Sequence, residues 1–272
     1  MPVRLVGVPW DATTLGRKGA RLAPEALRRE LARLHPFDAE GLRPISWLTG
    51  KDLALSEEHA DLLRAVGRTA EQGAKLDPEA PLVLLGGDHA VAYAGVGALH
   101  RRYPDLEVVS LDAHLDLRGP EGGPSNGNWA LRMMETFDCP YRVLGVGRFS
   151  NGPELFDRAR ERGVRWVSAE TVRRLGPERS LKELGVPQLR GKDVYLTLDV
   201  DVIDQAAAPG ASSPAPDGLS PLQVRELLHR ICASTRVRGF DLCEVNPTVD
   251  PSGITARLAA HLLLAFLSTT GT

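Results

Sequence analysis

Asp199-Val200-Asp201 and Asp112-Ala113-His114-Leu115-Asp116 are the two stretches that decide how this chain folds. Each follows an apolar run that predicts a buried strand, at residues 194–198 and 106–111 respectively. Side chains alternate in direction along a strand, so each stretch presents its acidic and histidine side chains to one side if the extended path continues. Four carboxylates and an imidazole then meet at one edge of a sheet.

This density of carboxylates predicts a metal centre. Like charges so close together disfavour ionisation unless a cation neutralises them. The simplest such cation is a divalent metal ion, and the number of ligands is sufficient for two ions.

We expect a single domain over residues 1–272, because no linker or low-complexity tract divides the chain. We also expect a cytoplasmic location. The formal net charge is −2, with 33 basic and 35 acidic residues, which gives no electrostatic reason to expect nucleic acid or an anionic membrane as a partner. We identify no apolar run long enough to span a bilayer and no signal-peptide profile. Cys139, Cys232 and Cys243 show neither metal-type nor disulfide-framework spacing, as expected in a reducing compartment.

Strands and helices alternate along the sequence, which predicts an α/β fold of three layers, a mainly parallel sheet with helices on both faces. The predicted strands are residues 4–9, 81–85, 106–111, 142–147, 164–167, 194–198 and 239–245, and the predicted helices are 24–34, 57–72, 90–102, 153–162, 177–184, 220–233 and 253–269. Ligands of such sheets bind beyond the carboxyl ends of the strands. Gly86-Gly87-Asp88-His89, the two acidic stretches and Glu244 all occupy that position.

Two long Gly- and Pro-containing loops, residues 118–128 and 206–219, leave the strand ends that carry the acidic stretches. Such a position is typical of a loop that covers a substrate. The alternative for the first loop is a tolerated surface insertion.

These motifs, in this order, resemble the ureohydrolase superfamily, which comprises arginases, agmatinases and formimidoylglutamases. The resemblance covers most of the chain and includes residues 19–28 (GARLAPEALR), Gly86-Gly87-Asp88-His89, both acidic stretches, Ala208-Pro209-Gly210 and Glu244-Val245-Asn246-Pro247. It implies an arginase-like fold, two Mn²⁺ ions per chain, a small amidine or guanidino substrate and a homo-oligomer, a trimer or hexamer.

The resemblance also implies a set of metal ligands. One ion is held by His89, Asp112, Asp116 and Asp199, and the other by Asp112, His114, Asp199 and Asp201. Oxygen-rich sites with few imidazoles suit Mn²⁺ better than Zn²⁺. The resemblance further implies that the ions would supply hydroxide near neutral pH to attack the amidine or guanidine carbon. We assign Asp116 and Glu244 to catalysis, with Glu244 facing the cationic amidine nitrogens; the alternative for Glu244 is a salt bridge within the site.

Two departures from arginases concern the loop at 118–128. Arginases carry a histidine where this chain has Ala130, at the end of Asn126-Gly127-Asn128-Trp129-Ala130. Arg118 stands where arginases use an asparagine to contact the amino-acid end of the substrate. We therefore predict Arg118, Asn126 and Asn128, together with Glu244, as substrate-binding residues. An arginine can form a bidentate pair with a carboxylate, although Arg118 could also be a surface residue that covers the loop.

The Asp116-Leu117-Arg118 sequence and residues 209–216 look more like formimidoylglutamases than arginases. We therefore expect N-formimidoyl-L-glutamate as the substrate, hydrolysed to L-glutamate and formamide. One alternative is a guanidino substrate, arginine or agmatine, with release of urea. Another is a catalytically silent family member that binds a ligand; the missing loop histidine favours it, and the intact carboxylate cluster argues against it.

Overall fold

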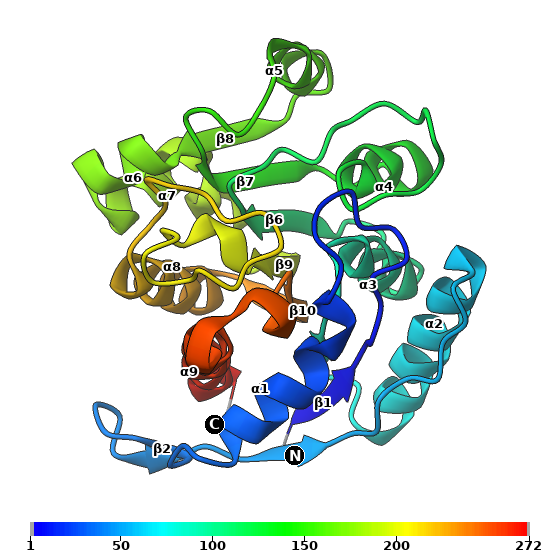
Figure 1. Ribbon diagram of the computed structural model, residues 1–272, viewed down its shortest axis with the longest axis vertical. Helices are drawn as coiled ribbons and strands as arrows, with labels where there is room; N and C mark the ends of the chain where they lie inside the picture. Colours follow the sequence, from blue (N-terminus) through cyan, green and yellow to red (C-terminus); the bar gives the residue numbers. More distant parts are fainter. Residues whose placement is uncertain (1–2, 271–272) are drawn as a thin grey trace.

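An eight-stranded parallel sheet forms the centre of the computed structural model, which describes residues 3–270. The strand order is β4-β1-β5-β10-β9-β6-β7-β8, and in Figure 1 the sheet rises from β1 near the bottom to β8 near the top. Every pairing in this sheet is parallel. The strands are β1 Val3–Gly7, β4 Trp47–Thr49, β5 Leu82–Leu85, β6 Glu107–Leu111, β7 Tyr141–Val146, β8 Arg165–Ser168, β9 Asp193–Asp199 and β10 Arg236–Cys243.

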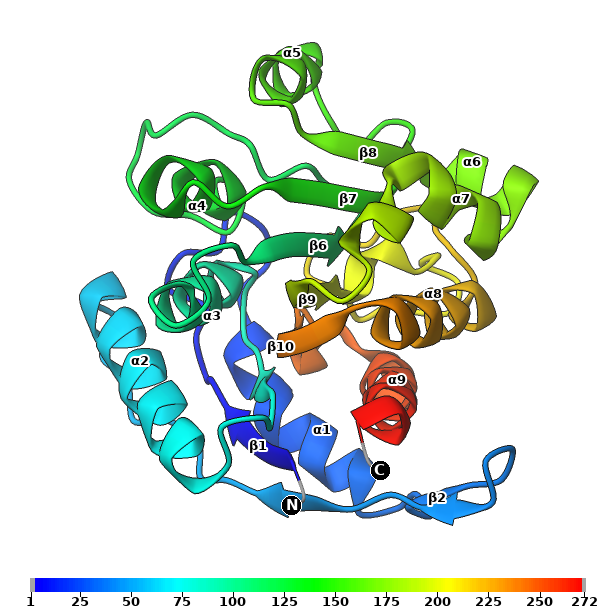
Figure 2. The same cartoon turned by 180° about the vertical axis from the view of Figure 1, so that it is seen from behind.

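Helices cover both faces of the sheet, which confirms the predicted α/β class (Figures 1 and 2). One face carries α1 (Ala23–Leu31), α6 (Ala169–Leu175), α7 (Pro177–Leu184), α8 (Pro221–Ser234) and α9 (Ile254–Thr270). The other carries α2 (His59–Leu76), α3 (Ala90–His100) and α4 (Trp129–Phe137), and α5 (Pro153–Glu161) lies beside β8. Short 3₁₀ turns fill connections at Ala20–Leu22 (η1), Val186–Leu189 (η2), Val200–Val202 (η3), Pro247–Val249 (η4) and Pro251–Gly253 (η5).

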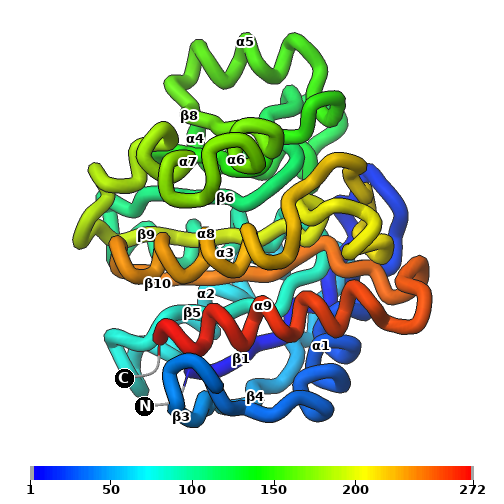
Figure 3. The backbone as a smooth tube through the Cα atoms, turned by 90° about the vertical axis from the view of Figure 1, so that its left-hand side faces the viewer, coloured from blue at the N-terminus to red at the C-terminus, as the bar shows by residue number. Residues whose placement is uncertain are grey.

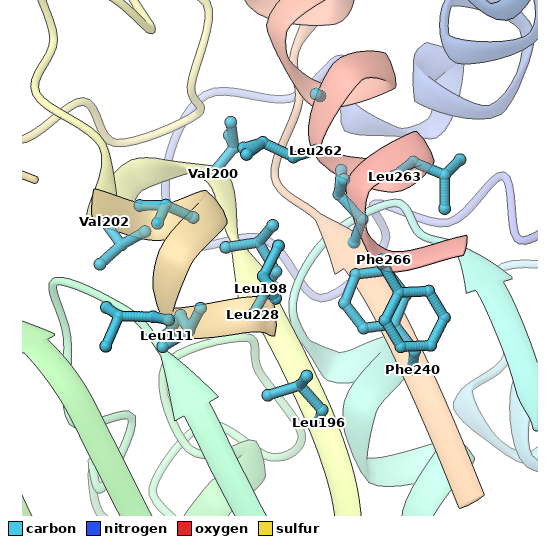
Figure 4. Close-up of a cluster of buried hydrophobic side chains, with 14 of the residues drawn as sticks. Leu111, Leu196, Leu198, Val200, Val202, Leu228, Phe240, Leu262, Leu263 and Phe266 are labelled. Atoms are coloured by element: carbon cyan, nitrogen blue, oxygen red, sulfur yellow. The ribbon is translucent and has the colours of Figure 1, made fainter. Parts of the chain in front are cut away.

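Apolar side chains of the sheet and helices form one buried cluster on the α1/α9 face and two on the α2/α3 face. Phe240 of β10 stacks on Phe266 of α9, with ring centroids 4.0 Å apart, beside the fully buried Leu198 and Leu228 (Figure 4). Burying a leucine or phenylalanine side chain stabilises a fold by roughly 1.5–3 kcal/mol. On the opposite face, Val96 of α3 and Met133 of α4 pack with Tyr195 of β9.

Helix α9 belongs to the buried cluster that contains Phe240 and Phe266. The segment Pro251–Thr270 is, by length and a hydropathy of 1.2, long and apolar enough to cross a membrane, so the expectation of no such run was wrong on those two criteria. However, 56% of its most apolar window is buried inside the protein, and α9 packs along α8 and α1 (Figure 3). The apolar composition of α9 therefore reflects its place in the core.

The structure differs from the predicted elements in several places. Helix α1 ends at Leu31, so Leu34 lies beyond it. Helices α4 and α6, edge strand β4 and the separate antiparallel pair β2 (Phe37–Asp38) and β3 (Arg43–Pro44) were not predicted. Strands of two or three residues are too short to show an alternating pattern. A capping box begins α8, because the Ser220 side chain accepts from the Gln223 backbone N–H while the Gln223 side chain accepts from Ser220 N–H.

The strand order brings the conspicuous motifs together. The chain passes from β5 through α3 to β6, and the two positions left between them are filled later by β9 and β10. Four adjacent strands, β5, β10, β9 and β6, therefore end at one edge of the sheet. The strand order reverses here, because β9 and β10 return to the positions between β5 and β6. Open α/β sheets bind ligands at such a point.

Candidate metal centre

His89 lies at the centre of the first group of predicted ligands. Its Nδ1 lies 3.0 Å from Asp116 Oδ2, 3.1 Å from Asp112 Oδ2 and 3.3 Å from Asp199 Oδ2. All four side chains are buried. These are the four residues predicted to hold one ion.

A second group adjoins the first and shares Asp112 with it. His114 Nδ1 lies 2.8 Å from Asp201 Oδ2 and 3.6 Å from Asp112 Oδ1. Both groups have the composition and spacing of sites that could hold a metal ion. The structure thus brings all six predicted ligands together, while metal binding itself stays a prediction.

The side chains converge through turns and not through continued strands. Strand β6 ends at Leu111, and Asp116 has a left-handed backbone with φ of 52°. Asp199 is the last residue of β9, and Asp201 lies in the 3₁₀ turn η3 that follows. The alternation expected from an extended path was therefore wrong, because hydrogen bonds from His114 N to Asp112 Oδ1 and from Asp201 N to Asp199 Oδ1 curl both segments.

The turn that delivers His89 depends on close backbone packing. A Cβ atom on Gly87 would lie 1.7 Å from Trp10 O, so only glycine fits there. The next residue, Asp88, accepts hydrogen bonds from Ala90 N and from Thr13 N and Oγ1. These contacts fix the start of α3, with His89 immediately before it.

A buried hydrogen-bond chain fixes the tautomer of His89. Asp241 accepts from Tyr195 Oη and from Thr197 Oγ1, each at 2.6 Å. Since the Thr197 proton is donated to Asp241, Thr197 Oγ1 accepts from His89 Nε2–H at 2.8 Å. The Nδ1 lone pair of His89 then faces the three carboxylates, which is the arrangement of a metal-ligating histidine.

Burial and mutual repulsion perturb the acidic groups. Burial raises the pKa of Asp199 well above its usual range, and the charges of Asp201 and Asp112 raise it further. Burial and the Asp112 charge raise the pKa of Asp116 to about 6. Burial opposes protonation of His114, but the charges and hydrogen bonds of Asp201 and Asp112 together outweigh burial and raise the His114 pKa to about 12. A buried cluster of this kind is complementary to added positive charge.

The unsatisfied atoms of the site also fit a metal. His89 Nδ1 and Asp112 Oδ2 are buried without a hydrogen-bond partner among the described residues. Ligand atoms around an octahedral ion with bonds of about 2.1 Å are roughly 3 Å apart, which matches the spacing around His89 Nδ1 of 3.0–3.3 Å. Carboxylate oxygens with few nitrogens are the donors that Mn²⁺ prefers.

Glu244 lies directly beyond β10 and next to His89. Its Oε1 accepts from the His89 backbone N–H at 2.8 Å and from Asn126 Nδ2 at 2.9 Å. Its Oε2 is buried without a hydrogen-bond partner among residues 3–270. The backbone of Glu244 is left-handed, with φ of 62°, a conformation that costs a non-glycine residue energy and is common at functional sites. One free carboxylate oxygen is therefore held beside the first ligand group.

The two asparagines of the loop have different contacts. Asn126 orients Glu244 and accepts from Leu15 N, which ties the N-terminal loop to this one. Asn128 is buried. Its amide oxygen accepts from Ser125 N–H, and its amide nitrogen donates to Gly119 O and Gly123 O. Asn128 therefore shapes the loop, and the predicted contact of either side chain with a substrate remains untested.

Arg118 is exposed at the rim of a hollow of about 550 Å³ that Thr13, Leu15, Glu121, Glu154 and Arg158 also line. Its guanidinium forms no hydrogen bond or ion pair with the other residues that the structure describes. Its backbone is anchored by Arg118 N, which donates to Gly127 O at 2.9 Å.

Sequence reasoning missed several residues that support the ligands. The Trp129 indole N–H donates to Asp116 Oδ2 at 2.6 Å. The Asn151 side chain donates to Ala113 O and accepts from Leu115 N–H. Thr197 and Asp241 were also missed, although Thr197 lies two residues before Asp199 on the same strand. Period-two alternation would have placed it on the face of Asp199.

Comparison with known proteins identifies the family. The model of the arginase family matches residues 1–268. The chain belongs to the arginase family. A formimidoylglutamase from Geobacillus thermodenitrificans is 35% identical over 258 residues, which cover 93% of this chain and 78% of that protein. An agmatinase from Bacillus subtilis is 30% identical over 279 residues, which cover 97% of this chain and 90% of that protein.

Solved structures of the family agree with the fold. The crystal structure of formimidoylglutamase from Bacillus subtilis aligns with a TM-score of 0.92 at 27% identity and covers 99% of this chain and 87% of that one. Trypanosoma cruzi formiminoglutamase, solved with two Mn²⁺ ions, has a TM-score of 0.87 at 21% identity, over 98% of this chain and 92% of that one. This arginase-family chain is a hydrolase that acts on C–N bonds other than peptide bonds.

Proposed function

We propose that this arginase-family chain is a binuclear manganese hydrolase of linear amidines and that it converts N-formimidoyl-L-glutamate to L-glutamate and formamide. The observation that carries the metal assignment is the pair of ligand groups that share Asp112. Mn²⁺ on a relative of known structure supports the choice of ion. When bound, two such ions acidify water toward neutral pH and polarise the carbon under attack.

The residues of this chain supply orientation and charge. Glu244 directs its free Oε2 to the amidinium N–H groups, while Oε1 stays fixed by His89 N and Asn126. A charge-assisted hydrogen bond of this kind contributes about 1.5–3 kcal/mol. Asp116, whose Oδ2 is fixed by Trp129, is the carboxylate that we assign to proton transfer to the leaving nitrogen. Ala130 offers no group for this step.

Arg118 supports the choice of an acidic substrate. Its guanidinium lines the hollow, is unpaired among residues 3–270, and supplies only donors and a positive charge. A substrate end with two carboxylates, as in formimidoylglutamate, matches that charge. The formimidoylglutamase relative at 35% identity supports the same choice.

An agmatinase-like activity is the second candidate. Glu121 and Glu154 line the same hollow as Arg118, and carboxylates suit the cationic end of a guanidino substrate. The agmatinase relative at 30% identity favours the same candidate. The two candidates differ in product, because hydrolysis of a guanidino substrate releases urea and not formamide.

A substrate panel tests the proposal. Mn²⁺-loaded protein is assayed with formimidoylglutamate, agmatine and arginine, and formamide, ammonia and urea are measured separately. Formimidoylglutamate should be preferred, and Arg118→Ala should raise its KM roughly tenfold to a hundredfold without loss of metal. Arg148 is an exposed arginine in the loop after β7. Arg148→Ala is the matched control and should leave KM unchanged. Preference for agmatine or arginine, or an unaffected Arg118→Ala, would overturn the substrate assignment.

The remaining parts of the proposal concern domain, location and assembly. The single eight-stranded sheet supports one domain over residues 1–272. Cys139, Cys232 and Cys243 are free thiols, which supports a cytoplasmic location. Family resemblance supports a homo-oligomer, a trimer or hexamer.

A further inference from the structure

Cys243 is a buried thiol that lies against the candidate metal centre but has no part in the proposed reaction. It is the last residue of β10, and its register partner on β9 is Asp199. Ligand atoms of Cys243, His89 and Asp199 lie within 4.8 Å of one another. The thiol is free, and its contact with Leu198 O at 3.6 Å is a weak hydrogen bond.

The arrangement follows from the two strands. Thr197 pairs with Asp241 and Asp199 pairs with Cys243, so these four side chains share one face at the end of β9 and β10. His89 lies over this face, held by Thr197 at Nε2. A second observation marks the place as a ligand site: His89 Nδ1 lies 3.3 Å from Asp199 Oδ2 and is buried without a hydrogen-bond partner in the described chain.

The donor set of this triad is softer than that of the two oxygen-rich groups. Thiolate sulfur favours Zn²⁺ and related soft ions, whereas carboxylate oxygen suits Mn²⁺. In a tetrahedral site with metal–sulfur and metal–nitrogen bonds of about 2.3 Å and 2.0 Å, ligand atoms are roughly 3.5 Å apart. The ligand atoms lie within 4.8 Å of one another, so side-chain adjustments of roughly 1.3 Å or less would bring them to that spacing.

We propose that His89, Asp199 and Cys243 form a binding mode for thiophilic divalent cations, Zn²⁺ or Cd²⁺, that competes with Mn²⁺ for His89. When the metal–sulfur bond forms, the S–H bond breaks and the proton leaves to the buffer. Because His89 and Asp199 belong to both ligand sets, occupation by the soft ion excludes Mn²⁺ from the first ligand group. This competition concerns metal binding alone and does not depend on the identity of the substrate.

Cadmium titration of the metal-free protein tests the proposal, because a cadmium–thiolate bond gives a charge-transfer band in the ultraviolet. The wild type should develop the band up to one thiolate per chain, and prior loading with Mn²⁺ should weaken Cd²⁺ binding. Cys243→Ser and Cys243→Ala should abolish the band and weaken Cd²⁺ binding by tenfold or more, with Mn²⁺ affinity unchanged. Circular dichroism shows which of the two variants is folded and can be used.

Matched variants separate this mode from other sites. Cys139→Ser and Cys232→Ser should keep the band, which excludes adventitious thiolate binding elsewhere. Asp201→Ala should also keep it, since Asp201 belongs to the other ligand group. A band that persists in a folded Cys243 variant, that requires Cys139 or Cys232, or that is absent from the wild type overturns the proposal. None of these readouts uses turnover, so failure here is distinct from failure of the proposed hydrolase activity.

Discussion

The indole N–H of Trp129 donates a hydrogen bond to Asp116 Oδ2 at 2.6 Å, while its ring lies 4.7 Å from the ring of His89. One residue of α4 therefore contacts two members of the first ligand group, which come from different strand ends. Hydrogen bonds to ligands orient them before the metal arrives, and their loss typically weakens metal binding tenfold to a hundredfold.

Trp129→Phe tests this orientation. The phenyl ring keeps the packing against His89 but removes the N–H donor, so Asp116 Oδ2 loses its fixed position. We expect Mn²⁺ affinity to fall by about tenfold, measured by competition with a chelator of known affinity. Trp166→Phe is the control, because Trp166 packs against Phe156 away from the site. Equal affinities of Trp129→Phe and wild type would show that the indole only fills space.

Thr197→Val tests the tautomer of His89. Valine has nearly the shape of threonine but neither accepts from His89 Nε2–H nor donates to Asp241 Oδ1. We expect Mn²⁺ affinity to fall about tenfold or more and stability to fall by about 1–3 kcal/mol, since Asp241 keeps a buried oxygen without its donor. Thr197→Ser retains the hydroxyl and should restore both. Titration with Mn²⁺ and chemical unfolding measure the two effects; a serine variant as weak as valine would contradict the role of the hydroxyl.

The sequence was sufficient to predict that these side chains converge, because strand ends and motifs coincide. His89, Asp112 and Asp199 each follow an apolar run, and parallel strands place their carboxyl ends at one edge. What the sequence could not show is how the side chains reach one another. Asp116 has a positive φ, and Asp201 lies in a 3₁₀ turn, so their directions depend on local hydrogen bonds and not on strand alternation.

The supporting residues differ in how visible they were. Thr197 shares the strand periodicity of Asp199, so the pattern could have revealed it. Trp129 and Asn151 belong to segments that meet the ligands only after folding, and no spacing within one segment predicts such a contact. The edge strand β4 was missed for another reason, because three residues carry too little pattern.

Asn151→Ala tests one of these hidden supports. The Asn151 side chain donates to Ala113 O and accepts from Leu115 N, so it holds the backbone on both sides of His114. Its removal should let the His114 segment shift and weaken the second ligand group. We expect about tenfold weaker binding of the second Mn²⁺ equivalent, measured by titration calorimetry. Phe149→Ala in the same loop is the control, because Phe149 is 90% exposed. Unchanged binding in Asn151→Ala would show that the turn is held by other contacts.

Asp201→Ala tests the number of ions. Asp201 contacts His114 at 2.8 Å and is not part of the group around His89, so its loss should remove one site and spare the other. Metal analysis after Mn²⁺ loading should therefore fall from about two ions per chain to about one. Asp204 is a nearby carboxylate that accepts from Ala206 N–H, and Asp204→Asn should keep the wild-type Mn²⁺ content. Two ions retained in Asp201→Ala would refute the assignment of the second group.

Glu244→Gln separates a catalytic carboxylate from a structural one. Glutamine can keep Oε1 as the acceptor for His89 N and Asn126 Nδ2, which preserves the local hydrogen bonds. The free Oε2, however, is replaced by an uncharged NH₂ group that cannot accept from an amidinium cation. Loss of a charged hydrogen bond worth about 1.5–3 kcal/mol should lower kcat/KM roughly tenfold to a hundredfold, with Mn²⁺ content unchanged. Glu161→Gln, at an exposed position at the end of α5, serves as the control for a general loss of negative charge. Full activity in Glu244→Gln would return Glu244 to a role in holding the loop, whereas loss of Mn²⁺ would place it in the metal framework.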